Sequence, residues 1–375
     1  MLLAALAEGQ TLTVLYNFTG ASDGSLPYAG IIQDAAGKLY GTAFAGGSDG
    51  GGVVYEVNTA GTERVLYAFC SQTSCADGSS SVAPLVRDKA GNLYGNTDYG
   101  GSTLYSFGTV FKIDTAGKET VLYSFTGGTD GCYPGQGLIR DGAGNLYGTT
   151  NNCGSGSAGL GNIFEVERAG NLILLHDFAG GSSDGANPAY GHLTMDKAGN
   201  LYGVTPLGGG NNNGVLYKLS KNGALTVLHS FGGGTSDGCN PQGSVVQDKS
   251  GNFYGTAGGC GTNNYGTIWK LSKTGKETIL HNFAGGTADG CYTVAGVTRD
   301  SKGNLYGVTL SCGAYNYGAL YKLSPSGMLT LLHSFDNSDG NLPYGELLRT
   351  AKGTLLGTAS MGGTYGYGTV WKYVP

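Results

Sequence analysis

Three short motifs recur seven times along the chain, always in the same order, and this repetition constrains the fold more than any other feature of the sequence. The first is an Asp-Gly pair, the second an apolar-Tyr-Gly triplet, and the third an apolar-aromatic pair followed by Lys or Glu. The Asp-Gly aspartates are Asp23, Asp77, Asp130, Asp184, Asp237, Asp289 and Asp339. The second-motif tyrosines are Tyr40, Tyr94, Tyr147, Tyr202, Tyr254 and Tyr306, with Leu356 in the seventh place. The third-motif aromatics are Tyr55, Phe111, Phe164, Tyr217, Trp269, Tyr321 and Trp371. A period of about 50 residues is typical of β-propeller blades.

Each repeat is expected to form four short strands. In the third repeat the runs 137–140 and 145–149 match this pattern, and the runs 109–113 and 119–125 precede them. Apolar and aromatic runs bounded by Gly, Asp and Asn are typical of strands. No segment shows the sustained 3.6-residue apolar period of a helix. The sequence therefore predicts an all-β, seven-bladed β-propeller with four antiparallel strands per blade, and a linear solenoid is the alternative.

The two ends of the chain favour the ring over the solenoid. The last repeat stops at Pro375 after its third strand, and residues 11–18 match the fourth strand of the other repeats. The last blade is complete only if this N-terminal strand closes the ring. We therefore predict a single propeller over residues 11–375. Residues 1–10 are interpreted as a tail, whose apolar run 1–7 lacks a basic leader and is either a signal-peptide remnant or a frayed start.

Residues 137–141, 144–150, 108–112 and 122–125 carry the combined consensus of the repeat. In these stretches the chain resembles the GloVer repeat of bacterial tandem-repeat surface proteins, and the resemblance covers nearly the whole chain from Thr11. It implies an exported, β-propeller-like bacterial protein of poorly defined activity. It supplies no catalytic residues to carry over.

The eight cysteines are expected to form four disulfides. Three pairs have the same separation and the same place in their repeats, and three repeats carry both members: Cys132 and Cys153, Cys239 and Cys260, Cys291 and Cys312. The remaining two, Cys70 and Cys75, are expected to pair with each other. Zinc sites are the alternative, but they need clustered Cys or His ligands. Disulfides would place the protein outside the cytosol, in an extracellular, cell-surface or periplasmic location.

Charge and motif content argue against several classes of function. The chain has 21 Lys and Arg against 26 Asp and Glu, with no basic cluster. Nucleic-acid binding is therefore not expected, because neutralising phosphates requires grouped Lys and Arg. No apolar run reaches the roughly 20 residues that span a bilayer. Motifs for nucleophile elbows, zinc proteases, phosphate loops and dinucleotide binding are absent, and we expect neither a cofactor nor a metal.

Departures from the repeat consensus point to a candidate ligand site. Four positions before the end of each first strand, at the mouth of the expected central channel, stand Gly30, Pro84, Gly137, His192, Ser244, Gly296 and Glu346. His192, Ser244 and Glu346 are the polar candidates for ligand binding. Two positions earlier lie Tyr28, Tyr190 and Tyr344, in the three repeats without cysteine. These tyrosines either anchor their loops or rim a pocket over blades seven and one.

The same face is expected to carry further tyrosines. Tyrosine combines a large apolar area with a polar tip, which suits it to stacking on sugar rings. The candidates are Tyr99, Tyr133, Tyr292, Tyr315 and Tyr365. A second set shares one position before a Gly and is expected to be structural: Tyr265, Tyr317 and Tyr367.

Residues present in every repeat are interpreted as architectural. Each Asp-Gly aspartate is expected to accept hydrogen bonds from its own loop rather than join a calcium ring, since calcium needs roughly six to eight converging oxygens. At one place in the fourth strand the chain uses either tyrosine or histidine: Tyr16, Tyr67, Tyr123, His176, His229, His281 and His333. Such free interchange favours a structural role over catalysis.

Three functions follow, in order of preference. The first is a secreted or surface protein that recognises glycans or another surface polymer through its tyrosine-rich loops. The second is a structural or adhesive propeller that binds other proteins. The third is a lyase or hydrolase that uses His192 and Glu346 at the channel mouth. These two side chains are expected nearly opposite each other, so that only a substrate filling the mouth would reach both.

Overall fold

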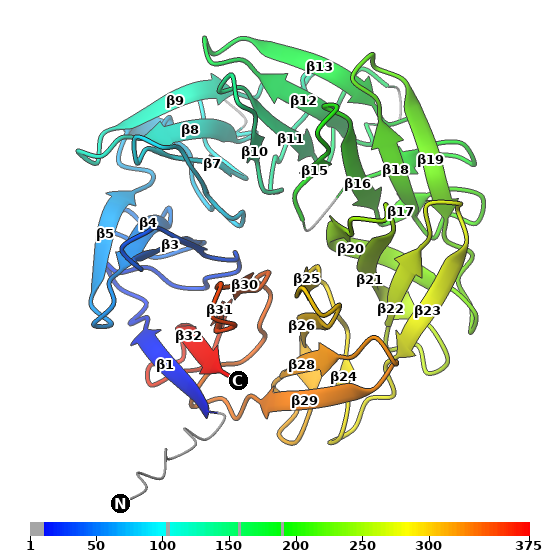
Figure 1. Cartoon of the computed structure of the whole chain (residues 1–375). Helices are drawn as coiled ribbons and strands as arrows, with labels where there is room; N and C mark the ends of the chain where they lie inside the picture. The colour runs from blue at the N-terminus through cyan, green and yellow to red at the C-terminus, as the bar shows by residue number, and fades with distance from the viewer. Residues whose placement is uncertain (1–10, 103–105, 157–158, 189–190) are drawn as a thin grey trace, which may run out of the picture.

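The computed structural model describes residues 11–102, 106–156, 159–188 and 191–375. These residues form a ring of seven four-stranded antiparallel sheets around a central channel (Figure 1). Their one helical segment is a 3-10 turn at Thr73–Cys75. The predicted all-β, seven-bladed propeller is confirmed. The predicted N-terminal tail, residues 1–10, lies outside the described residues.

Within each blade the strands are numbered from the channel outward. Blade one contains β2 (Ile32–Gln33), β3 (Leu39–Ala43), β4 (Val53–Val57) and β5 (Glu63–Ala68). Blade two contains β6 (Val86–Arg87), β7 (Leu93–Thr97), β8 (Thr109–Ile113) and β9 (Glu119–Ser124). Blade three contains β10 (Ile139–Arg140), β11 (Leu146–Thr150), β12 (Asn162–Val166) and β13 (Leu172–Asp177). Blade four contains β15 (Thr194–Met195), β16 (Leu201–Thr205), β18 (Val215–Leu219) and β19 (Leu225–Ser230).

The remaining blades follow the same order. Blade five contains β20 (Gly238–Gln247), β21 (Phe253–Cys260), β22 (Thr267–Leu271) and β23 (Glu277–Asn282). Blade six contains β25 (Thr298–Arg299), β26 (Leu305–Thr309), β28 (Ala319–Leu323) and β29 (Leu329–Ser334). Blade seven contains β30 (Leu348–Arg349), β31 (Leu355–Ala359), β32 (Thr369–Val374) and β1 (Thr11–Asn17). Two short ribbons extend blades four and six: β14 (Gly185–Ala186) with β17 (Leu207–Gly208), and β24 (Gly290–Cys291) with β27 (Ser311–Cys312).

The N-terminal strand closes the ring, as predicted. β1 runs antiparallel to β32, with Thr11 opposite Val374 and Asn17 opposite Thr369. The N–H of Phe18 donates to the carbonyl of Gly368 (3.0 Å). The corresponding phenylalanine makes the same bond in the other blades, for example Phe69 to Gly52 (2.9 Å). The first strand of the chain therefore serves as the outer strand of the last blade.

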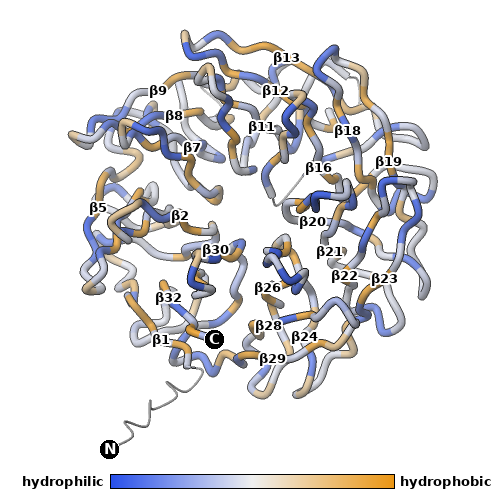
Figure 2. The backbone as a smooth tube through the Cα atoms, viewed as in Figure 1, coloured by the Kyte–Doolittle hydropathy of each residue, from blue (hydrophilic) through white to orange (hydrophobic). Residues whose placement is uncertain are grey.

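The core lies between consecutive blades, and hydrophobic segments accordingly occur all around the ring (Figure 2). The third-motif aromatic of each blade is buried and meets the phenylalanine that ends the previous outer strand, as in Phe18 and Tyr55, with ring centroids 5.0 Å apart. The six equivalent pairs have centroids 5.0–5.5 Å apart. Each such pair contributes about 0.5–1.5 kcal/mol beyond the burial of its area. The glycine of the second motif makes room for this ring, because a Cβ at Gly307 would lie 2.3 Å from Tyr321 Oη.

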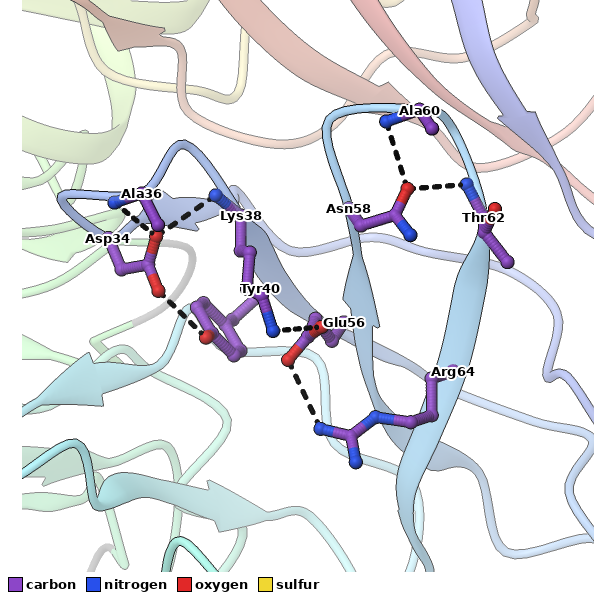
Figure 3. A network of polar contacts seen from close by, with 9 residues as sticks. All are labelled: Asp34, Ala36, Lys38, Tyr40, Glu56, Asn58, Ala60, Thr62 and Arg64. Atoms are coloured by element: carbon purple, nitrogen blue, oxygen red, sulfur yellow. Dashed lines mark hydrogen bonds and ion pairs between the residues drawn. The ribbon is translucent and has the colours of Figure 1, made fainter.

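The turns between first and second strands are held by an aspartate side chain (Figure 3). Asp34 Oδ1 accepts the N–H groups of Ala36 (2.9 Å) and Lys38 (3.0 Å), and its Oδ2 accepts the Tyr40 hydroxyl (3.0 Å). Five further blades repeat the tyrosine bond through Asp88, Asp141, Asp196, Asp248 and Asp300. The second-motif tyrosine is thus an anchor for a tight turn.

The four predicted disulfides are present: Cys70–Cys75, Cys132–Cys153, Cys239–Cys260 and Cys291–Cys312. The last three join the segment that leads into a blade's first strand to the segment that follows its second strand; in blade five these segments continue the strands, so that Cys239 lies in β20 and Cys260 ends β21. These two segments also pair through backbone contacts in every blade. We call the side of the ring that carries both segments the loop face. Disulfides of this number are typical of proteins that fold outside the cytosol.

Candidate functional site

The seven residues predicted at the channel mouth do meet around the axis of the ring. A Cβ at Gly30 would lie 2.7 Å from the carbonyl oxygen of Glu346, and one at Gly296 would lie 2.3 Å from that of Ser244. A Cβ at Gly137 would lie 2.9 Å from both His192 and Pro84. The glycines therefore let neighbouring first strands approach more closely than any side chain would allow, and the mouth is narrow.

His192, Ser244 and Glu346 join across this mouth. His192 Nδ1 lies 3.2 Å from Glu346 Oε2, and the N–H of Ser244 donates to Glu346 Oε1 (2.7 Å). Ser244 Oγ accepts the N–H of His192 (2.7 Å) and also bonds His192 Nδ1. We call these three residues the cross-channel bridge. The prediction that His192 and Glu346 stand apart on opposite sides of the mouth is wrong, because the small residues beside them narrow the channel.

The charges of the bridge stabilise each other. Burial lowers the pKa of His192, but the Glu346 carboxylate outweighs burial and raises this pKa above its ordinary value. Burial raises the pKa of Glu346, but His192 and Ser244 outweigh it and lower this pKa to about 2. The side chains are 34% and 25% exposed, so the pair is only partly shielded from solvent. Because its three residues come from three blades, the bridge has the arrangement of a structural contact that links those blades.

Two cavities lie beside the bridge and share Gly30, Pro84 and Glu346 in their walls. The first, of about 310 Å³, is lined by loop-face residues, including Tyr28 and Tyr344. The second, of about 560 Å³, is the channel lumen and is lined mainly by the first strands of blades one to three and seven. We call the first the loop-face cavity. Its volume is at the lower end of the range of small-molecule sites.

Two predicted tyrosines come together in the loop-face cavity. Tyr28 of blade one and Tyr344 of blade seven both line it, with ring centroids 5.2 Å apart and nearly perpendicular planes. The Phe44 ring also packs against Tyr28, with ring centroids 5.7 Å apart. The third predicted tyrosine, Tyr190, lies outside the described residues.

The structure adds Asp98 to this cavity. It follows β7, and its Oδ1 is buried without a hydrogen-bond partner among the described residues. Burial raises the pKa of Asp98 to about 7. One signal in the sequence could have found it, since the other repeats carry no acid at the equivalent position: Phe44, Asn151, Pro206, Gly258, Leu310 and Ser360.

The other predicted tyrosines lie elsewhere and do not line the loop-face cavity. Tyr99 and Tyr133 form a ring pair with centroids 5.5 Å apart. Tyr292 is 45% exposed, and Tyr315 and Tyr365 are 60% and 58% exposed. They are therefore available to a ligand that extends beyond the cavity.

The Asp-Gly aspartates bond as the architectural interpretation requires. Asp23 accepts the Thr19 N–H (2.7 Å) and the Tyr16 hydroxyl (2.8 Å). Where histidine replaces tyrosine, its Nε2 contacts the aspartate instead, as His176 contacts Asp184 (3.0 Å). Tyrosine and histidine interchange because either can donate to the same carboxylate.

Comparisons with known proteins agree with this architecture. The model of the Gloeobacter/Verrucomicrobia repeat matches residues 2–160 and 144–371. No curated protein matches the chain. Among solved structures, the fold is similar to extracellular domains of a hybrid two-component system (14% identity, TM-score 0.61) and of a one-component system (11%, TM-score 0.58), both from B. thetaiotaomicron. It is also similar to a puromycin hydrolase (13% identity, TM-score 0.52).

These likenesses concern the fold. The alignments cover 98%, 96% and 89% of this chain, but only 41%, 40% and 50% of the three structures, so the chain spans half or less of each. In the described part of the chain, no helix has the length and apolar character to cross a bilayer. The repeat model, by contrast, matches almost the whole sequence in tandem. The chain belongs to the Gloeobacter/Verrucomicrobia repeat family.

Proposed function

We propose that this protein is an exported bacterial receptor that binds the end of a glycan chain in its loop-face cavity. The observation that carries the proposal is the joint presence there of two tyrosine rings, Tyr28 and Tyr344, and a buried carboxyl, Asp98. Sugar recognition needs both kinds of group: aromatic faces for the C–H surface of the ring, and polar atoms that fix its hydroxyls.

Asp98 supplies the orienting polar atom. A buried acceptor without a partner costs about 1–3 kcal/mol, and rotation of the Asp98 side chain, so that its carboxyl accepts a ligand hydroxyl, would recover this energy. A site of this kind also discriminates strongly, because a ligand without that hydroxyl would leave the carboxyl unpaired.

The position of the cross-channel bridge favours binding of the end of a glycan over binding of its interior. His192 and Glu346 meet beside the cavity, so a polymer entering from the loop face meets the bridge instead of threading the channel. The exposed tyrosines Tyr315 and Tyr365 are candidates to contact the outer part of the same polymer.

Binding to an array of bacterial and plant glycans tests this proposal. We expect Tyr28→Ala/Tyr344→Ala and, separately, Asp98→Ala to lower the affinity for the best glycan at least tenfold, equivalent to about 1.4 kcal/mol. Met328→Ala, at an exposed position that does not line the cavity, is the control, with an expected change below about threefold. Melting curves verify that each variant folds. Absence of glycan binding, together with a specific protein partner, would favour an adhesive protein instead.

The pKa of Asp98 also favours a second candidate function, hydrolysis or elimination at the same cavity. A carboxyl that keeps its proton near pH 7 can act as a general acid, and Glu346, whose pKa is low, lines the same cavity. Turnover of a bound glycan that disappears in Asp98→Asn, while binding persists, would identify this activity.

A further inference from the structure

The outer strands follow the rim of the ring, so that each ends where the next begins (Figure 1). At each such place, which we call a rim junction, the Tyr or His near the end of one outer strand bonds the following Asp-Gly aspartate. A residue at the start of the next outer strand completes the junction. In ring order from the junction of blades seven and one, these residues are Glu63, Glu119, Leu172, Leu225, Glu277, Leu329 and Leu12.

The junction of blades four and five combines three groups that bind metals. His229 comes from β19, Asp237 from the loop that follows, and Glu277 from β23. One ligand atom from each lies within 4.8 Å of the other two, and His229 Nε2 is 3.2 Å from Asp237 Oδ2. Among the described residues, no other three His, Cys or acidic side chains come together in this way.

Two features of this junction point to a bound cation. Glu277 Oε1, like the Oε1 atoms of Glu63 and Glu119 at two other junctions, is buried and has no hydrogen-bond partner in the described part of the chain, but only Glu277 has a histidine beside it. Asp237 accepts the N–H groups of Gly232 (2.6 Å) and Gly238 (2.7 Å), which hold its carboxylate in place opposite Glu277. Two acidic groups at this distance repel each other. A divalent ion between them would offset the repulsion and supply the missing partner.

We propose that His229, Asp237 and Glu277 form a zinc site that fastens blade four to blade five. One imidazole nitrogen and two carboxylate oxygens are common zinc ligands, and three protein ligands leave a fourth position for water. His229 and Asp237 are 18% and 16% exposed, so an ion can reach the site from the rim. Ligands of a tetrahedral zinc ion lie about 3.3 Å apart. Rotation of the flexible Glu277 side chain would close the remaining distance.

The other rim junctions explain why the site is expected here alone. Glu63 and Glu119 also face an Asp-Gly aspartate, but Tyr16 and Tyr67 stand where His229 stands. The junction of blades five and six has His281 and Asp289, but Leu329 replaces the glutamate. Competing sites are few, since all eight cysteines form disulfides and the chain has five histidines.

The residues at equivalent positions of the other rim junctions provide the substitutions for the test. The full chain, dialysed against chelator, is titrated with zinc chloride by calorimetry. We expect one zinc ion per chain and a rise in melting temperature with zinc. His229→Tyr and Glu277→Leu copy residues that other junctions accept, so both variants should fold, and each should lower zinc affinity at least tenfold. His281→Tyr is the matched control and should leave affinity unchanged.

Three outcomes would overturn the proposal: no zinc binding by the parent chain, undiminished binding in both His229→Tyr and Glu277→Leu, or an equal loss in His281→Tyr. Adding the glutamate to the next junction provides a converse measurement. If Leu329→Glu folds, it should raise the stoichiometry from one zinc ion to two.

Discussion

Asp98 is an ionisable residue at a position where the other six repeats have none. The equivalent loop positions carry residues with no ionisable group, whereas Asp98 places a carboxyl in the loop-face cavity. Its pKa of about 7 means that the folded chain keeps a proton that the unfolded chain releases near pH 4. Between these values the unfolded chain binds fewer protons, so this group makes stability fall as the pH rises.

Replacing Asp98 should reverse that loss. We expect Asp98→Asn to stabilise the protein at pH 8, by up to about 4 kcal/mol at about 1.4 kcal/mol per pKa unit, and to have little effect at pH 4. Urea unfolding at both pH values measures the difference. An equal change at both would mean that the carboxyl is ionised to the same extent in the folded and unfolded chain.

The disulfide-linked loops are the element that varies most among otherwise similar blades. Cys153, Cys260 and Cys312 have φ of 63°, 61° and 67°, in the left-handed region that favours glycine. Blades without this disulfide do have glycine there: Gly46, Gly100, Gly208 and Gly362, with φ of 73–85°. The crosslinked blades therefore combine a disulfide with a strained backbone.

Removing one crosslink should separate these two contributions. We expect Cys291→Ala/Cys312→Ala to lose about 3 kcal/mol of unfolding free energy through the crosslink, and to keep the ~1 kcal/mol of backbone strain that Cys312 already has. Cys291→Ala/Cys312→Gly copies blade four, which has Ala186 and Gly208, and should recover the smaller part. Denaturant unfolding of the two variants side by side provides the comparison, and equal stabilities would argue against backbone strain.

At the scale of the whole molecule, closure of the ring depends on β1. Deleting residues 1–18 removes the outer strand of blade seven and the contact of Phe18 with Tyr55. We expect this deletion to abolish cooperative unfolding, as followed by circular dichroism and calorimetry. Deleting only residues 1–10 is the control and should leave the melting temperature within a few degrees. An unchanged melt after the longer deletion would contradict the closure.

The repeat predicted the ring, its closure and three of its disulfides, because each depends on positions counted along the chain; the fourth was expected because Cys70 and Cys75 were the two cysteines that remained. It also predicted which residues surround the channel mouth, but not that His192 and Glu346 touch. Counting positions gives the order around the axis, whereas the channel radius depends on how closely residues such as Gly137 and Gly296 let the strands pack. The zinc site proposed at the junction of blades four and five was not predicted from the sequence. Its residues His229 and Glu277 belong to different repeats, and counting positions within one repeat does not show that they meet.

The register between β1 and β32 has a mechanical consequence. Thr11 pairs with Val374, so the chain enters and leaves the ring at the same end of one antiparallel pair. Tension applied between Thr11 and Val374 would act along the hydrogen bonds, which lie perpendicular to the strands. These bonds would therefore break one at a time, starting from the end at which the force is applied. We therefore expect the β1–β32 pair to separate at low force when Thr11 and Val374 are pulled apart.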